Sequence, residues 1–174
     1  MMTVLIIILA LIVLSLAVYY ITNINNQAGA YTTLVVTLLT LGLFLLEGDR
    51  LSEAGSFGIL SFDVTPLGWF FSIIMLIVYA MVAFFNPYWM KKLLHPAAYN
   101  LLFLLSLAGT IGVFFADNFI ALFLFLEIVV WSSMFIIPFG KSRNATVVYY
   151  AMSTFGSFTL LYGIFTVSYT HLTL

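Results

Sequence analysis

Residues 118–139 read NFIALFLFLEIVVWSSMFIIPF, and this stretch decides the fold because it is long and apolar enough to cross a bilayer. Its single charged side chain, Glu127, lies near the middle. A charged group at the centre of a membrane helix costs roughly 2.5–3.5 kcal/mol on insertion scales, so such residues usually face the inside of a helix bundle and mark an ion path. Glu127 is therefore the candidate functional residue.

Glu127 has no obvious partner in the sequence. Its helical neighbours at spacings of three and four are apolar or aromatic, and we expect none of them to pair with a carboxylate: Phe123, Leu124, Val130 and Trp131. No predicted span contains a lysine, an arginine or a histidine. The sequence therefore predicts a cationic partner on another subunit, or on a helix outside these 174 residues.

Two interpretations of Glu127 are open at this point. In the structural one, the acid is neutral and hydrogen-bonds a backbone or hydroxyl group of another helix, with no part in transport. In the functional one, it is a titratable station that gains and loses a proton as a cation moves toward it or away from it. The functional interpretation is favoured, because carboxylates in mid-span are rare without a function.

The composition is that of an integral membrane protein. The chain is 64% hydrophobic and only 6% charged, with a mean hydropathy of +1.22. A net charge of −1 and the lack of a basic patch exclude a nucleic-acid-binding protein. With no cysteine and only His95 and His171 as histidines, the chain has no metal-ligand cluster. We therefore expect it to hold no redox centre of its own.

The hydropathy pattern predicts an all-α integral membrane protein with about six transmembrane helices. The first is expected to be a retained helix rather than a signal peptide, because it has full length and lacks a basic leader. The acidic connection at 47–66 is expected to lie outside the membrane, and its apolar run 57–62 could be extended or interfacial. The predicted spans are 3–21, 30–46, 67–85, 97–115, 118–139 and 145–165.

The charges in the connecting loops predict the orientation. Loops after the first, third and fifth spans carry only basic residues, namely Lys91, Lys92, Lys141 and Arg143. Loops after the second and fourth carry one base, Arg50, and the acids Glu47, Asp49, Glu53, Asp63 and Asp117. The positive-inside rule therefore places the basic loops in the cytoplasm and the N-terminus outside.

Several hydroxyl groups and two basic residues are candidates for supporting Glu127. Ser132, Ser133 and Tyr150 could help to hold a water chain, although hydroxyls in membrane helices more often hydrogen-bond a neighbouring backbone. Lys141 and Arg143, in the basic loop, are further supporting candidates. Other hydroxyls of the last two spans share this interpretation: Tyr149, Thr154, Ser157, Thr159 and Tyr162.

From Tyr99 to about Phe165 the chain resembles the first part of a known proton-conducting module. The matching residues are LAGTIGVFFADNFIALFLFLE at 107–127, an aromatic-rich exit ending at Pro138, a basic loop with Arg143, and FGSFTLLYGIF at 155–165. This module is shared by the antiporter-like subunits of respiratory complex I (NADH:quinone oxidoreductase), Mrp-type sodium/proton antiporters and energy-converting membrane hydrogenases.

The resemblance implies a role for Glu127 and a plan for the whole chain. Glu127 would correspond to the family's essential membrane glutamate on the fifth helix, which pairs with a lysine on a later helix. The fold would be the first part of a longer inverted-repeat structure. Residues 1–96 would form an N-terminal three-helix region and 97–167 the first three helices of the proton-conducting repeat. The end, 168–174, follows no family pattern, so we expect a non-native tail on an N-terminal fragment.

The function implied is translocation of protons, or of sodium ions, by a subunit of a multisubunit redox-driven or Mrp-type complex in the cytoplasmic (inner) membrane. Its partners would be the lipid bilayer, other membrane subunits and the transported ions. The chain would bind no cofactor, and quinone, flavin or metal centres would belong to partner subunits. The alternative is a non-transporting membrane scaffold subunit in which Glu127 is structural. A stand-alone permease is disfavoured because the chain has no internal repeat.

Overall fold

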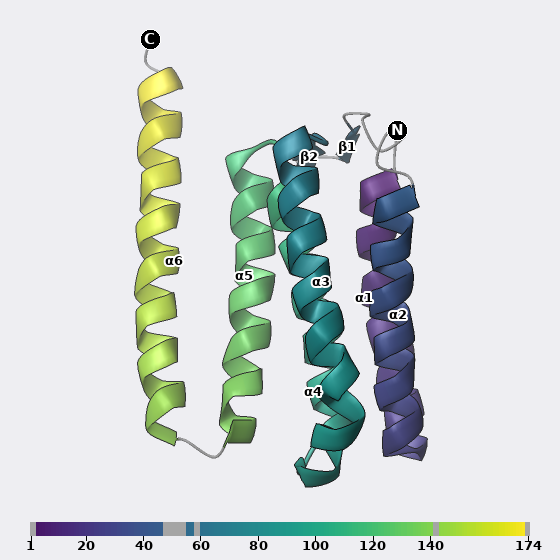
Figure 1. The fold of residues 1–174 in the computed structure, drawn as a ribbon. Coiled ribbons are helices and arrows are strands. Elements are labelled where there is room, and N and C mark those ends of the chain that lie inside the picture. The colour runs from purple at the N-terminus through teal and green to yellow at the C-terminus, as the bar shows by residue number, and fades with distance from the viewer. Residues whose placement is uncertain (1–2, 47–54, 58–59, 141–142, 173–174) are drawn as a thin grey trace.

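The computed structural model describes residues 3–46, 55–57, 60–140 and 143–172 (Figure 1). This part of the chain contains six helices that are long and apolar enough to cross a membrane, which confirms the predicted all-α, multi-pass fold. The helices alternate in direction along the chain. They are α1 (Thr3–Ile24), α2 (Asn26–Leu46), α3 (Pro66–Trp89), α4 (Pro96–Phe115), α5 (Phe119–Ile136) and α6 (Arg143–Leu172), with short 3-10 turns at Met90–Lys92 and Ile137–Gly140.

Several helix ends differ from the predicted spans. Helix α1 ends at Ile24 rather than at 21, and α2 begins at Asn26 rather than at 30. The third span was expected to end at Asn86-Pro87, but α3 continues through both residues to Trp89. Pro87 removes only one backbone donor, and the Met90 N–H still bonds the Asn86 carbonyl, so the helix tolerates the proline. The last span was expected to end at 165, whereas α6 continues to Leu172. Whether the last residues are a non-native tail stays a prediction.

Helix α4 is the centre of the bundle. More than half of its residues are buried, and it packs against α1, α2, α3 and α5. The contact with α5 is close, because a methyl group on Gly112 would overlap the ring of Phe125. One on Gly109 would lie 2.9 Å from Val129 Cγ2. Helices α4 and α5 are therefore close neighbours, and their contact depends on two glycines.

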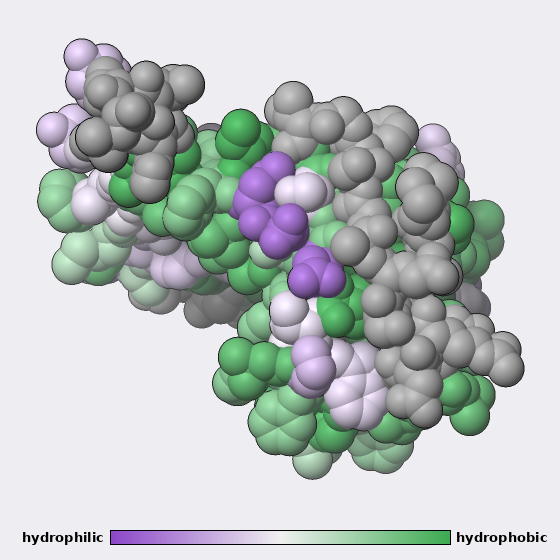
Figure 2. All heavy atoms as spheres, turned by 90° about the horizontal axis from the view of Figure 1, so that it is seen from above, coloured by the Kyte–Doolittle hydropathy of each residue, from purple (hydrophilic) through white to green (hydrophobic). Residues whose placement is uncertain are grey.

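A short β-hairpin closes one end of the bundle. Strands β1 (Gly55–Phe57) and β2 (Leu60–Phe62) are antiparallel, so the described residues of the apolar run at 57–62 are extended. The β2 strand is fastened to the α4–α5 turn, since the Asp63 N–H donates to the Phe115 carbonyl (3.0 Å) and the Asp117 N–H to the Ser61 carbonyl (2.9 Å). Figure 2, which views this end, shows hydrophilic residues gathered within a hydrophobic surround.

The bundle interior contains many hydroxyl groups, and most of them donate to a carbonyl of their own helix. Examples on α2 are Thr33, Thr37 and Thr40, each bonded to the backbone four residues earlier. Such bonds satisfy the hydroxyl without linking helices. In the described part of the chain, hydrogen bonds between side chains link helices in two places: between Tyr79 and Ser106 of α4 (2.7 Å), and in a series of bonds through Asn100.

The series of hydrogen bonds through Asn100 joins three helices at the end of the bundle opposite the hairpin. The Asn86 Nδ2 donates to Asn100 Oδ1 (2.7 Å), and Asn100 Nδ2 donates to Thr22 Oγ1 (3.1 Å). All three side chains are at most 2% exposed. These bonds connect α1, α3 and α4 where no water can replace a lost partner.

Replacing Asn100 by leucine is expected to lower the free energy of unfolding by about 1–3 kcal/mol, because the buried amide of Asn86 loses its acceptor. The measurement is equilibrium unfolding of the reconstituted chain in lipid and detergent mixtures. The control is Asn23→Leu, at an exposed position in the last turn of α1. Equal stabilities for the two variants would contradict a stabilising role of the network.

Cysteine labelling tests the orientation, and the chain has no native cysteine. The exposed residues Gln27 and Lys92 lie at one end of the bundle, and the exposed Asp117 lies at the other (Figure 1). With the basic end in the cytoplasm, Asp117→Cys should react with an impermeant maleimide outside intact cells. Gln27→Cys and Lys92→Cys should react only after the membrane is opened. External reaction of either of them would overturn the predicted orientation.

Candidate functional site

Helix α5 places Glu127 near the middle of the membrane span. The helix begins after Asn118, whose side-chain oxygen accepts a hydrogen bond from the Ala121 N–H (2.7 Å) and so caps the first turn. The helix continues without interruption to Ile136. Glu127 therefore lies in the middle of a regular helix, with its side chain half-buried.

Glu127 has a partner on its own helix, contrary to the prediction from the sequence. The indole Nε1–H of Trp131 donates to Glu127 Oε2 over 2.9 Å. That prediction was wrong because it counted aromatic neighbours as unable to pair, although the indole nitrogen is a hydrogen-bond donor. The i, i+4 spacing was the signal that could have identified the contact.

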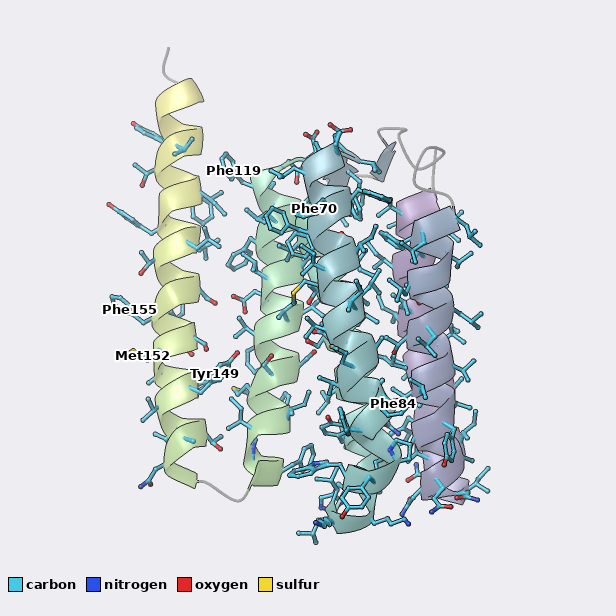
Figure 3. The ribbon with its side chains drawn as sticks, viewed as in Figure 1. Phe70, Phe84, Phe119, Tyr149, Met152 and Phe155 are labelled. Atoms are coloured by element: carbon cyan, nitrogen blue, oxygen red, sulfur yellow. The ribbon has the colours of Figure 1, made fainter. Side chains whose placement is uncertain are left out.

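One side of Glu127 faces a cavity of about 270 Å³ between α5 and α6. The α6 side supplies hydroxyl groups because Ser153, Thr154 and Ser157 recur at spacings that put them on one helix face. These three are half-buried, whereas Met152 and Phe155 point away from α5 and are more than 70% exposed (Figure 3). The lining residues are Phe123, Glu127, Val130, Trp131, Met134, Tyr150, Ser153, Thr154, Ser157, Phe158 and Leu161.

The other side of Glu127 faces a larger groove of about 670 Å³ between α1, β2, α4 and α5. Apart from Glu127, Trp131 and Ser132, every lining residue is an aliphatic or a phenylalanine. The lining residues are Leu5, Ile8, Leu9, Ile12, Leu60, Leu102, Leu105, Leu124, Phe125, Glu127, Ile128, Trp131, Ser132 and Phe135. Glu127 thus lies between a cavity with hydroxyl groups and an apolar groove.

Some of the other predicted site residues line the same cavity as Glu127, and others do not. Tyr150 lines the cavity between α5 and α6 with Glu127, as do Thr154 and Ser157. Ser132 is 1% exposed, lines the apolar groove instead, and donates to the Ile128 carbonyl (2.7 Å). Ser133 supplies a backbone carbonyl to the Ile137 N–H.

The remaining candidates lie farther from Glu127 or are not described. Thr159 donates to the Phe155 carbonyl, Tyr149 is half-buried, and Tyr162 is exposed. Arg143 is the first residue of α6, and its side chain is not described; Lys141 lies outside the described residues. Ser153 was not identified from the sequence, although it precedes Thr154 on the face that includes Ser157.

The arrangement can hold a proton but offers no cation in the described part of the chain. No lysine, arginine or histidine is among the described residues that line the two cavities. Among residues 3–46, 60–140 and 143–172, no group of three or more metal-ligating side chains was found. The chemistry on offer is a carboxylate, an indole donor and a set of hydroxyl groups.

Comparison with known proteins identifies the fold. No protein-family model and no curated protein matches the chain. The chain is similar to one chain of the membrane-bound sulfane sulfur reductase, an archaeal respiratory membrane complex, with a TM-score of 0.73 and 20% sequence identity. The match covers 94% of this chain and 36% of the solved chain, so this chain spans little more than a third of its length. At this identity the likeness establishes a shared multi-pass membrane fold.

Proposed function

We propose that this chain is part of an antiporter-like subunit that translocates protons, or sodium ions, across a membrane within a multisubunit complex. The observation that carries the proposal is the position of Glu127, a carboxylate at mid-span between a cavity that contains hydroxyl groups and an apolar groove. The fold shared with a chain of a respiratory membrane complex supports it, as does the resemblance at 99–165 to proton-conducting modules.

In the proposed mechanism, Glu127 accepts a proton through water and hydroxyl groups in the cavity between α5 and α6. Tyr150, Ser153, Thr154 and Ser157 are the lining groups that can hydrogen-bond such water. The apolar groove keeps bulk water from the opposite side, which makes the carboxyl group responsive to any charge that approaches it. Each proton would reach Glu127 from the cavity between α5 and α6 and leave it on the side of the groove.

The proposal requires a cation that comes close to Glu127 and then withdraws. None lines the two cavities in the described residues, so we expect it on a helix outside these 174 residues or on another subunit. A lysine there would match the resemblance.

The remaining parts of the proposal follow from the same resemblance. They are the division into 1–96, 97–167 and a non-native 168–174, a place in the cytoplasmic membrane, and cofactors held by partner subunits alone. The direct test of the function is proton translocation by membrane vesicles from cells in which Glu127 has been replaced by glutamine at the native locus, measured at equal amounts of assembled protein.

A non-transporting scaffold subunit is the second candidate. The observation that favours it is the hydrogen bond from Trp131, which gives the carboxylate a partner within its own helix. In a scaffold, Glu127 would serve only to order α5. The glutamine variant separates the two candidates, because an amide oxygen can still accept the indole hydrogen bond.

A further inference from the structure

Trp131 and Glu127 together form the boundary between the two cavities. They are the two residues common to both linings: each contacts the cavity with hydroxyl groups that faces α6 and the apolar groove that faces α1 and α4. The indole ring is half exposed and its N–H bonds the carboxylate, while the ring itself lies 6.2 Å from that of Phe135. A tryptophan that faces lipid needs a partner for its N–H group, and here that partner is the carboxylate of Glu127.

The strength of this hydrogen bond depends on the protonation of Glu127. An ionised carboxylate makes a shorter and stronger bond to a donor than a neutral carboxyl group does. The indole N–H can only donate, so it cannot compensate when the acid is neutral. A protonated Glu127 is therefore held less tightly by Trp131 than an ionised one.

We infer that Trp131 is a positioning residue that controls toward which cavity the Glu127 carboxyl group turns; this rests on the proposed function. The indole holds the ionised carboxylate in place at the boundary. When Glu127 takes a proton from a hydronium ion in the cavity facing α6, which leaves a water molecule behind, the indole bond weakens and the side chain rotates. On the groove side the same proton then passes to the neutral form of the basic group that the proposed function requires, which becomes the cation, and the regenerated carboxylate rebinds the indole. Trp131 keeps its own proton throughout.

Few titratable side chains share the two cavities with Glu127. From α6 the titratable lining residue is Tyr150, and the lining residues that α1, β2 and α4 supply in the described part of the chain include no titratable side chain. If the indole N–H signal of Trp131 changes with pH, and this change is lost in the Glu127→Gln variant and kept in Tyr150→Phe, the change reports on Glu127.

The hydrogen bond can be tested on the unmodified 174-residue chain in lipid nanodiscs. The chain has three tryptophans, so indole ¹⁵N labelling gives three N–H signals that single Trp→Phe variants assign. Glu127→Gln should shift the Trp131 signal and leave that of Trp69, whose indole bonds the Phe44 carbonyl (3.2 Å). Raising the pH should also move the Trp131 signal, in wild type and in Tyr150→Phe but not in Glu127→Gln. A Trp131 signal that ignores both changes would overturn the inference.

The role in translocation is tested in vesicles from cells that carry the variants at the native locus. Trp131 is replaced by β-(3-benzothienyl)alanine, which has nearly the same shape but no N–H group. We expect proton translocation to fall about tenfold or more, whereas the same replacement at Trp69 should have little effect. Wild-type translocation with the Trp131 replacement, beside an inactive Glu127→Gln variant, would reject the inference and leave the proposed function standing. Full proton translocation by the Glu127→Gln variant would instead reject the proposed function, and with it the positioning role of Trp131.

Discussion

Glu127→Gln is expected to lower proton translocation by about a hundredfold or more, the scale that loss of a proton-transferring group produces. The amide keeps the size of the side chain and can still accept the Trp131 hydrogen bond, so packing of α5 should survive. It can neither carry a negative charge nor release a proton. The measurement is the quenching of a pH-sensitive dye in inverted membrane vesicles, normalised to assembled protein.

Glu127→Asp is the matched control for this prediction. The charge remains and only the reach of the side chain is shorter, so translocation should be partly retained. Ser132→Ala is a second control, since Ser132 bonds its own helix and faces the apolar groove. Wild-type rates with the glutamine variant would show that Glu127 is structural and would favour the scaffold subunit.

Gly112→Leu is expected to destabilise the protein by about 3 kcal/mol, the upper range for overpacking a close contact. Even a single methyl group at this position overlaps the ring of Phe125. The ring is 6% exposed and lies 5.7 Å from that of Phe62, so it has little room to move without disturbing the hairpin. Unfolding of the reconstituted chain, followed by circular dichroism during a denaturing detergent titration, gives the difference.

Two further variants make the second prediction specific. Gly42→Leu is the control of equal size, because nothing lies within 4 Å of a methyl group at that position. Its stability should stay close to wild type. Adding Phe125→Ala to Gly112→Leu vacates the space that leucine needs, so the double variant should lose less stability than the sum of the two single changes. Strict additivity would show that the two residues do not compete for the same space.

The candidate site could be predicted only in part. A carboxylate in an apolar span is visible in any hydropathy profile, and Thr154 and Ser157 were candidates as hydroxyls of the following span. Ser153 was missed because its role depends on which face of α6 meets α5. A mean hydropathy is the same for all rotations of a helix about its axis. The bond from Trp131 was missed for another reason: its i, i+4 spacing was visible, but the indole was not counted as a hydrogen-bond donor.

The sequence by itself determined that the described part of the chain has six helices long and apolar enough to cross a membrane, with Glu127 near the middle of one, because bilayer thickness sets the length of a span and each charged residue is costly inside it. Only the tertiary structure decided that α4 is central, that β2 fastens to the α4–α5 turn, and that Glu127 and Trp131 lie between two unlike cavities. The physical reason is that lipid is as apolar as the side chains it contacts. The choice of neighbours therefore depends on close packing at residues such as Gly112 and on a few hydrogen bonds between helices, rather than on hydrophobicity.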